Sequence, residues 1–252
     1  TLSQAEIDGL SDDADEMAEQ LAQMAGPGAQ SFVDGFRGGR LPPKDQIQQI
    51  RFHTNSFSAE YHEAGMVRVE VITKPGMGGW RGSSNFGFRD ESLNATNAFA
   101  DEKGPEQMRR YMVNFSGPLA KGRTGLSLSF DGNSSYDSRT IVAQSPNSGT
   151  VNSLAVSPTD AINFSARVEH LMGGSAQVRA EYSRRQNERS NLGVGDFVLS
   201  ERADATEMNT DTFRLRSTNV IGKKVFCEFG LELNNSTYAT LAGSLAPTIR
   251  VN

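Results

Sequence analysis

The chain has 252 residues, a formal net charge of -5 and only 37 % hydrophobic residues, against roughly 45–50 % in ordinary globular domains. The acidic balance argues against a nucleic-acid partner, which would require a basic face. Cys227 is the single cysteine, which excludes an internal disulfide, and with three scattered histidines we expect neither a metal site nor a cofactor. No apolar run reaches the roughly 18–20 residues of a membrane helix, but a transmembrane barrel needs only alternating strands of about 10 residues.

Residues 1–25 favour a helix. Ser11 is followed by three acidic residues, which are stabilised near a helix N-terminus, so we expect the helix to begin there. Apolar residues then recur at spacings of three and four and predict one buried face, made of Leu10, Ala14, Met17, Leu21 and Met24. The segment Gly26-Pro27-Gly28 ends the helix.

Short strands and tight loops follow. Ser31–Val33 is strand-like, and the pairs Gly38-Gly39 and Pro42-Pro43 indicate loops. Residues 47–53 predict a strand, or a short helix that runs into one. Residues 66–73 alternate, with Val67, Val69 and Val71 on one face. Residues 1–76 are therefore expected to form a small α+β domain.

After Gly76 the pattern becomes one of alternating strands with no convincing helix. Seven runs place apolar side chains on one face and polar or charged ones on the other, at residues 80–89, 111–115, 126–130, 162–168, 176–182, 213–215 and 225–233. Such strands separate an apolar medium from water. A β-sandwich core supplies this environment, and so does a barrel with lipid outside and a solvated lumen.

The links between these runs alternate in length. Those at 90–109, 140–160 and 187–208 are long, and those at 117–123, 172–174 and 221–223 are short. Outer-membrane barrels have long extracellular loops and short periplasmic turns, whereas long unstructured loops are uncommon in compact soluble domains. The pattern favours a barrel. A secreted or surface β-sandwich, acting as an adhesin or carbohydrate-binding module, remains the alternative.

The number of runs also bears on completeness. Seven strands, with residues 248–251 as a candidate eighth, fall short of the even-numbered closed barrels of bacteria and would leave open edges in lipid. We therefore expect the sequence to be a fragment of a longer chain. The predicted fold class is mainly β, with a small α+β domain followed by antiparallel up-and-down strands of an incomplete barrel.

Several short segments occur together in a characteristic order. They are Phe32–Gly35, Pro43–Arg51, Asn55–Tyr61, Val69–Gly76, Trp80–Ser83, Asn94–Phe99 and Ser116–Leu119. In order and spacing they resemble the plug domain and first barrel strands of TonB-dependent outer-membrane receptors, in particular the Oar-like branch. The resemblance covers residues 32–119, and residues 120–252 agree by strand pattern alone.

The resemblance implies a plug at residues 1–76 inside a barrel whose first strands occupy 77–252, in the outer membrane of a Gram-negative-type bacterium. It implies a non-enzymatic receptor or transporter for an unidentified extracellular ligand, in contact with the lipid bilayer and energised through the TonB complex. No TonB box is recognisable in this sequence. The residues that match the plug motifs are Asp34, Gly35, Asn55, Ala59, Glu60, Thr73, Lys74 and Gly76.

Charged residues on the polar faces of the later strands are candidates for a functional surface. We predict that they line the lumen and meet the plug, whereas on a sandwich they would be ordinary solvent-exposed charges; they are Arg167, Glu169, Arg179, Glu181, Arg214, Arg216, Glu228 and Glu232. His53 and His62 are expected to make plug–wall or surface hydrogen bonds, with a metal pair as the remote alternative. No nucleophile elbow, phosphate loop or zinc motif is present, which agrees with a non-enzyme.

Overall fold

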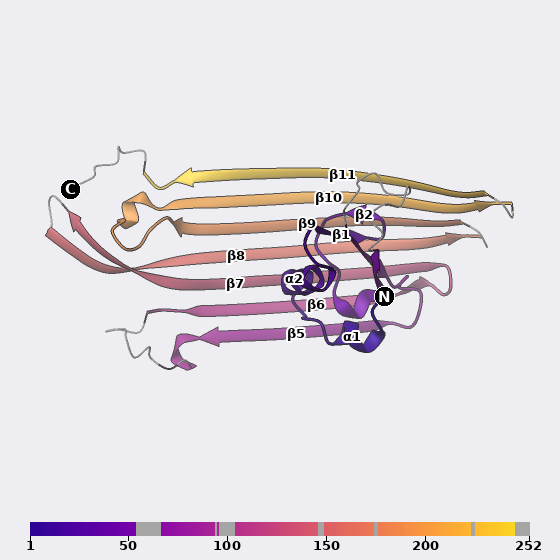
Figure 1. Cartoon of the computed structure of the whole chain (residues 1–252), viewed down its shortest axis with the longest axis horizontal. Coiled ribbons are helices and arrows are strands. Elements are labelled where there is room, and N and C mark those ends of the chain that lie inside the picture. Colours follow the sequence, from indigo (N-terminus) through magenta and orange to yellow (C-terminus); the bar gives the residue numbers. More distant parts are fainter. Residues whose placement is uncertain are drawn as a thin grey trace.

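The computed structural model describes residues 1–53, 67–93, 95, 104–145, 149–173, 176–222 and 225–244. They form two β-sheets. The first belongs to a small unit that lies against one face of the second, a long sheet that we call the large sheet (Figure 1). The small unit contains α1 (Gln4–Asp8), α2 (Ala14–Ala25), β1 (Ala29–Val33), β2 (Phe36–Arg37), the 3-10 turn Lys44–Gln46, β3 (Ile47–His53) and β4 (Val67–Thr73).

The small unit is built like an ordinary water-soluble domain. Its sheet has the order β2-β1-β4-β3, in which β1 runs parallel to β4 and β3 runs antiparallel to it. The two helices and this sheet enclose an apolar core in which Leu21, Ile47, Ile50 and Val71 are completely buried. The predicted alternation of residues 66–73 is confirmed, since Val69 and Val71 both point into this core.

The helical prediction for residues 1–25 was partly wrong. The segment forms two helices, because Ser3 and Glu6 make a capping box for α1 and the chain leaves the helix at Gly9. Asp13, not Ser11, caps α2 by accepting hydrogen bonds from the backbone N–H groups of Asp15 and Glu16. Met24 is 57 % exposed and does not belong to the buried face.

Among the described residues, the large sheet contains seven antiparallel strands in consecutive order, which confirms the predicted up-and-down arrangement; the candidate eighth strand at residues 248–251 lies outside the described residues. They are β5 (Arg81–Asp90), β6 (Gln107–Ala120), β7 (Thr124–Ser145), β8 (Gly149–Met172), β9 (Ala176–Leu192), β10 (Asp204–Ile221) and β11 (Val225–Ala242). The links at one end of the large sheet are short, and we call this the short-turn end. At the other end two links are longer, and the third joins the very long strands β7 and β8. The small unit lies nearer the short-turn end (Figure 1). We call the opposite end the long-link end.

The prediction of a long loop at 140–160 was wrong. β7 and β8 continue as a paired ladder up to Ser145 and Gly149, so that these residues belong to one long hairpin. Polar and apolar residues alternate along a strand only where its two faces contact different media. Backbone hydrogen bonds between strands can continue where both faces contact water, and there the sequence gives no alternation to mark the strand. The 193–203 link folds back onto this hairpin, where Ile141, Ala143, Ala155 and Val194 form a small apolar cluster.

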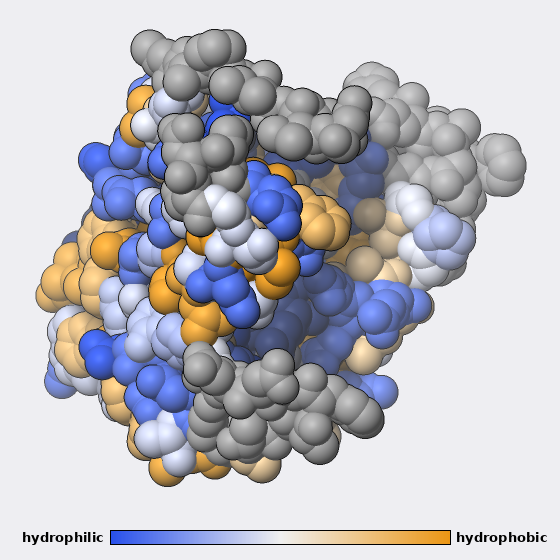
Figure 2. All heavy atoms as spheres, turned by 90° about the vertical axis from the view of Figure 1, so that its left-hand side faces the viewer, coloured by the Kyte–Doolittle hydropathy of each residue, from blue (hydrophilic) through white to orange (hydrophobic). Residues whose placement is uncertain are grey.

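The two faces of the large sheet are inverted relative to a soluble protein. On β6, Asn114 is 2 % exposed while its neighbours Val113 and Phe115 are 52 % and 45 % exposed, and on β7 Ser129 is 6 % and Phe130 42 % exposed. The face covered by the small unit is thus polar and the uncovered face is apolar. Viewed onto the long-link end, hydrophilic side chains fill the hollow and hydrophobic ones gather at the outer rim (Figure 2).

Among the described residues, no second sheet covers the apolar face. None of the described helices is long and apolar enough to span a bilayer.

Candidate functional site between the small unit and the large sheet

Strand register arranges the predicted charged residues in rows across the large sheet. Residues directly opposite each other in antiparallel strands project from the same face. A first charged row therefore runs across β8 to β11 as Arg167, Glu181, Arg214 and Glu232. A second charged row, nearer the short-turn end, consists of Glu169, Arg179 and Arg216. Opposite charges alternate along the first row, so each cation meets a carboxylate.

Contacts within the rows are close. In the first row Arg214 Nε lies 2.7 Å from Glu232 Oε2 and its Nη1 lies 3.9 Å from Glu181 Oε1. In the second row Arg179 Nη2 lies 2.8 Å from Glu169 Oε2. Arg216 Nη2 lies 2.7 Å from Glu228 Oε1, the eighth predicted residue, which comes from the neighbouring strand β11. Arg167 Nη1 lies 4.0 Å from Glu181 Oε2, so the eight predicted lumen charges form three groups on the large sheet, which Asp34 links into one network.

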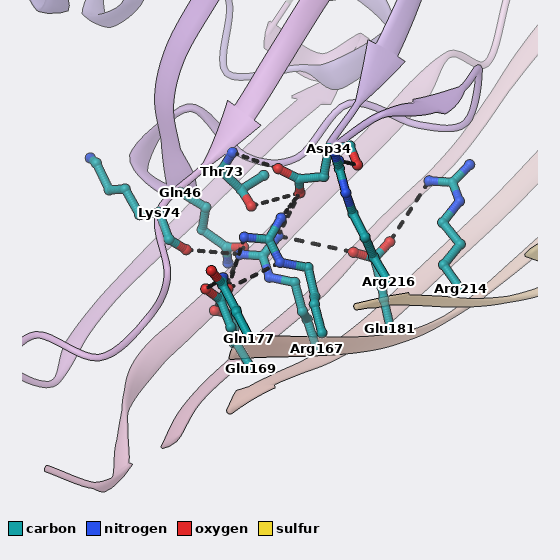
Figure 3. Close-up of polar contacts among 12 residues, drawn as sticks. Asp34, Gln46, Thr73, Lys74, Arg167, Glu169, Gln177, Glu181, Arg214 and Arg216 are labelled. Carbon is teal, nitrogen blue, oxygen red and sulfur yellow. Dashed lines mark hydrogen bonds and ion pairs between the residues drawn. The ribbon is translucent and has the colours of Figure 1, made fainter. Parts of the chain in front are cut away.

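Asp34 joins this network to the small unit (Figure 3). Its carboxylate is 7 % exposed, with Oδ2 2.5 Å from Arg179 Nη1 and 3.9 Å from Arg167 Nη1. Thr73 donates to the same carboxylate twice, from its backbone N–H at 3.0 Å and from its hydroxyl at 2.7 Å. Burial by itself would raise the pKa of Asp34, but Arg179, Thr73 and Arg167 together outweigh it and hold the pKa below its usual value.

The turn between β1 and β2 brings Asp34 to this position. Asp34 has φ of 50° and Gly35 has φ of 87°, a left-handed pair that closes the turn. The backbone N–H of Asp34 donates to Val71 O at 2.9 Å, which ties the turn to β4. The carbonyl of Asp34 accepts a hydrogen bond from Arg216. The guanidinium of Arg216 occupies the space that a Cβ on Gly35 would need, so a larger residue would have to displace it and would also be strained at this φ.

The other predicted plug residues divide into three groups. Lys74 lies at the interface, where its carbonyl is 3.5 Å from Arg167 Nη2 and its ammonium donates to Asp45 O. Gly76, with φ of 59°, passes so close to the large sheet that a Cβ would lie 3.1 Å from Ser127 Oγ. Three further predicted residues, Asn55, Ala59 and Glu60, lie outside the described residues, as does His62.

Two other sequence predictions concern His53 and Cys227. His53 Nε2 lies 3.2 Å from Glu70 Oε2 on the neighbouring strand of the small unit. Cys227 is exposed on β11, on the edge strand of the large sheet. In the described part of the chain, no three His, Cys, Asp or Glu side chains come together in a way that could hold a metal ion.

Sequence reasoning missed a second set of contacts, nearer the long-link end. Arg40 of the small unit bridges Asp15 at 3.2 Å and Asp131 of β7 at 2.9 Å. Arg110 of β6 lies 3.4 Å from Asp13, the residue that caps α2. Asp131 and Arg110 were detectable as charges on the polar faces of their strands, but nothing local in the sequence indicates Arg40 as their neighbour.

Hydrophilic space remains between the small unit and the large sheet. A cavity of about 410 Å³ lies against an uncharged row of the sheet, next to the first charged row, formed by Ser129, Ser165, Ser183 and Thr212. A cavity of about 700 Å³ continues toward the long-link end, where Asn133, Asn187 and Arg189 line it. The hollow is visible from that end in Figure 2.

The similarity of this chain to known proteins lies in its structure, at low sequence identity. No protein-family model and no curated protein sequence matches the chain. Among solved structures, it is similar to the FrpB iron transporter from Neisseria meningitidis (F5-1 variant), with a TM-score of 0.49, 11 % identity and 83 % of this chain covered. It is also similar to the siderophore receptor PirA from Acinetobacter baumannii, with a TM-score of 0.40, 15 % identity and 85 % covered.

The chain spans 41 % of the length of each of these structures.

Proposed function

We propose that this chain forms the plug and the first wall strands of an outer-membrane receptor and transporter of the TonB-dependent kind. In this proposal the small unit is the plug, the large sheet is part of the barrel wall, and the boundary lies between Gly76 and Trp80. The polar face of the large sheet borders the lumen, and the apolar face meets lipid. The ligand enters from the long-link end, which faces the outside of the cell.

The inverted large sheet is the observation that carries this proposal. Apolar side chains are the exposed ones on central strands as well as edges, as Val113, Phe115 and Phe130 show. Soluble monomers rarely expose an apolar surface of this extent, because its contact with water is unfavourable. In a bilayer the same arrangement is the stable one, since lipid covers the apolar face and paired strands satisfy the backbone.

The charged rows fit a plugged lumen. Buried ion pairs contribute little net stability, because the loss of hydration offsets their attraction, and removing one partner is costly. Their location against Asp34 suggests that they determine where the small unit sits within the wall. Barrels of about 22 strands have a lumen wide enough to hold such a plug.

Membership of the Oar-like branch and coupling to TonB rest on the motif resemblance, above all on the segments Phe32–Gly35 and Val69–Gly76. Asp34 and Thr73, the central residues of these two segments, bond to each other in the small unit. The two motifs therefore form one local structure, which supports their assignment as a pair.

The test uses the single tryptophan, Trp80, which is 51 % exposed and stacks on Phe115 with ring centroids 4.8 Å apart. The full-length protein, with any tryptophan outside these 252 residues replaced by phenylalanine, is reconstituted into vesicles whose lipids carry bromine at defined depths along the acyl chain. Because Trp80 precedes the first residue of β5 near the short-turn end, we expect its fluorescence to be quenched most by shallow bromines.

Adjacent residues on opposite faces of β10 provide the matched control. In a Trp80→Phe background, Phe213→Trp is expected to be quenched by deep bromines because residue 213 faces lipid. Thr212→Trp is expected to resist quenching because residue 212 lines the interior cavity. A chain that stays monomeric in water without detergent, with neither tryptophan quenched by lipid, would overturn the proposal and favour a soluble β-rich module.

A further inference from the structure

We propose that Arg214 and Arg216 form a gate on a hydrophilic path that runs between the small unit and the large sheet, along β9 and β10. The inference rests on the proposed function, because a path across the wall sheet has a role only in a barrel. Three cavities and their shared lining residues define the path, and the arginines close it at its narrowest point. Figure 3 shows Arg216 beside Asp34, and Arg214 beside Glu181.

The cavities lie end to end. The first, about 410 Å³, is on the long-link side and shares Val33, Glu181 and Arg214 with a middle cavity. The middle cavity shares Asp34, Arg179 and Arg216 with a third cavity of about 210 Å³, which extends toward the short-turn end as far as Thr218. Shared residues mean that the three spaces are consecutive parts of one route.

The middle cavity is the constriction. Its volume is about 10 Å³, which is room for about one water molecule and too little for a hydrated ion. The wide spaces on both sides are lined by polar and apolar groups alike, and the polar side chains, such as Ser183 and Thr212 on one side and Gln177 and Thr218 on the other, can bind water. Whatever opens this one point therefore connects the two larger cavities.

Two guanidinium groups and a glycine-rich turn close the constriction. The turn comprises residues 35–39 of the small unit, and we call it the flap. Arg216 packs on Gly35 and donates to the carbonyl of Asp34. Arg214 packs on Gly39, where a Cβ would lie 2.7 Å from Nη2, and stands 5.4 Å from the centre of the Phe36 ring.

The partners of these arginines allow the flap to separate from them. Arg214 and Arg216 are neutralised on the wall itself, by Glu232 and Glu228, each at 2.7 Å. Among the described residues of the small unit they contact two backbone carbonyls, of Asp34 and of Gly38 in the flap, together with two flap glycines and the Phe36 ring. Withdrawal of the flap therefore leaves no buried unpaired charge, whereas displacement of Asp34 would separate it from Arg179.

Asp34 is accordingly the anchor and the flap is the moving part. Gly35, Gly38 and Gly39 all have positive φ angles, so the flap is built from residues with little steric restriction on its backbone. Displacement of the flap has to loosen the pairing of β2 with β1 and the hydrogen bond from Arg216 to Asp34 O, while the Asp34 carboxylate keeps its contacts with Arg179 and Thr73.

The experiment measures the conductance of the full-length protein in planar bilayers. Arg214→Ala with Arg216→Ala is expected to raise the resting conductance several-fold over wild type, because the constriction loses both of its wall-side groups. Glu228 and Glu232, which lose their partners, are 41 % and 32 % exposed in their side chains and can be hydrated. Phe36→Ala, which removes the flap side, is expected to produce a smaller rise.

The matched control is Arg185→Ala with Arg189→Ala, which removes two arginines of β9 that line the larger cavities but not the constriction. It is expected to leave the resting conductance at the wild-type level. Folding of each variant is checked by the heat-dependent gel mobility typical of folded barrels. A folded gate variant with wild-type conductance, or an equal rise in the control, overturns the gate. Failure of every variant and of wild type to insert would instead count against the proposed function.

Discussion

The small unit and the large sheet bury opposite kinds of side chain. The small unit encloses Leu21, Ile50 and Val71 and exposes polar groups, as a protein folded in water does. The large sheet buries Asn114, Arg167 and Glu169 and exposes its aromatic and aliphatic side chains. One chain therefore contains regions adapted to two solvents, and the boundary between them is the polar face of the large sheet. Polar side chains of the kind that the small unit exposes are the ones that the large sheet buries.

The largest expected effect comes from a charge in the core of the small unit. Ile50→Asp buries a carboxylate with no partner at a position with 0 % exposure, so we expect a loss of more than about 4 kcal/mol, enough to unfold the small unit. Limited proteolysis in detergent should show digestion of residues 1–53 while the large sheet persists as a folded band. Equal protection of both regions in the variant would contradict their independence.

A charge on the outward face of the large sheet should have an effect of intermediate size. Phe130→Arg places a cation where we expect the bilayer interior, at a cost of about 2–4 kcal/mol near the midplane. Denaturant titration of the protein in vesicles measures this change. The matched variant Phe197→Arg, at an 84 % exposed position in the 193–203 link, should change stability little. Equal effects of the two variants would argue that residue 130 does not face lipid.

The smallest of the three effects concerns the boundary between the regions. Asp34→Asn removes the charge that Arg179 and Thr73 bind, and we expect a loss of about 1.5–3 kcal/mol because Arg179 keeps Glu169 as a partner. Hydrogen exchange of β1 and β4 measures this loss of stability, and the exchange rates of the large-sheet strands should not change.

The same carboxylate makes the boundary sensitive to acid. Because the folded pKa of Asp34 lies below the ordinary value, its contribution is complete above the unfolded pKa of about 3.9 and is lost as pH falls through the lower folded pKa. Asp34→Asn should remove this part of the acid dependence. Identical acid profiles for wild type and variant would show that Asp34 does not link the two regions.

Several features of this fold could be predicted because they depend on local order. Seven strands and their apolar faces follow from a period of two, which is a property of the extended backbone alone. The buried valines of β4 follow from the same rule. The start of α2 was misplaced by two residues, because Ser11 and Asp13 are both good capping residues and only the path of the chain from α1 selects Asp13.

The sequence indicates which charged residues share the polar face, but not which residues they contact. All eight charges that were predicted to line a lumen lie on the polar face, as alternation indicates, yet nothing near Arg216 in the sequence identifies its partner Asp34, which is 182 residues away. The contacts of Arg40 and Asp131 were missed for the same reason.

The sequence by itself therefore determined the strands and the faces of the large sheet, since each depends on neighbouring side chains. Only the tertiary structure decided where β7 and β8 end, which charges meet across the interface, and that Gly35 and Gly39 receive the two arginines. Those outcomes depend on strand register and on the docking of one unit against another. Register and docking are set by the sum of many distant contacts, which no short segment of sequence contains.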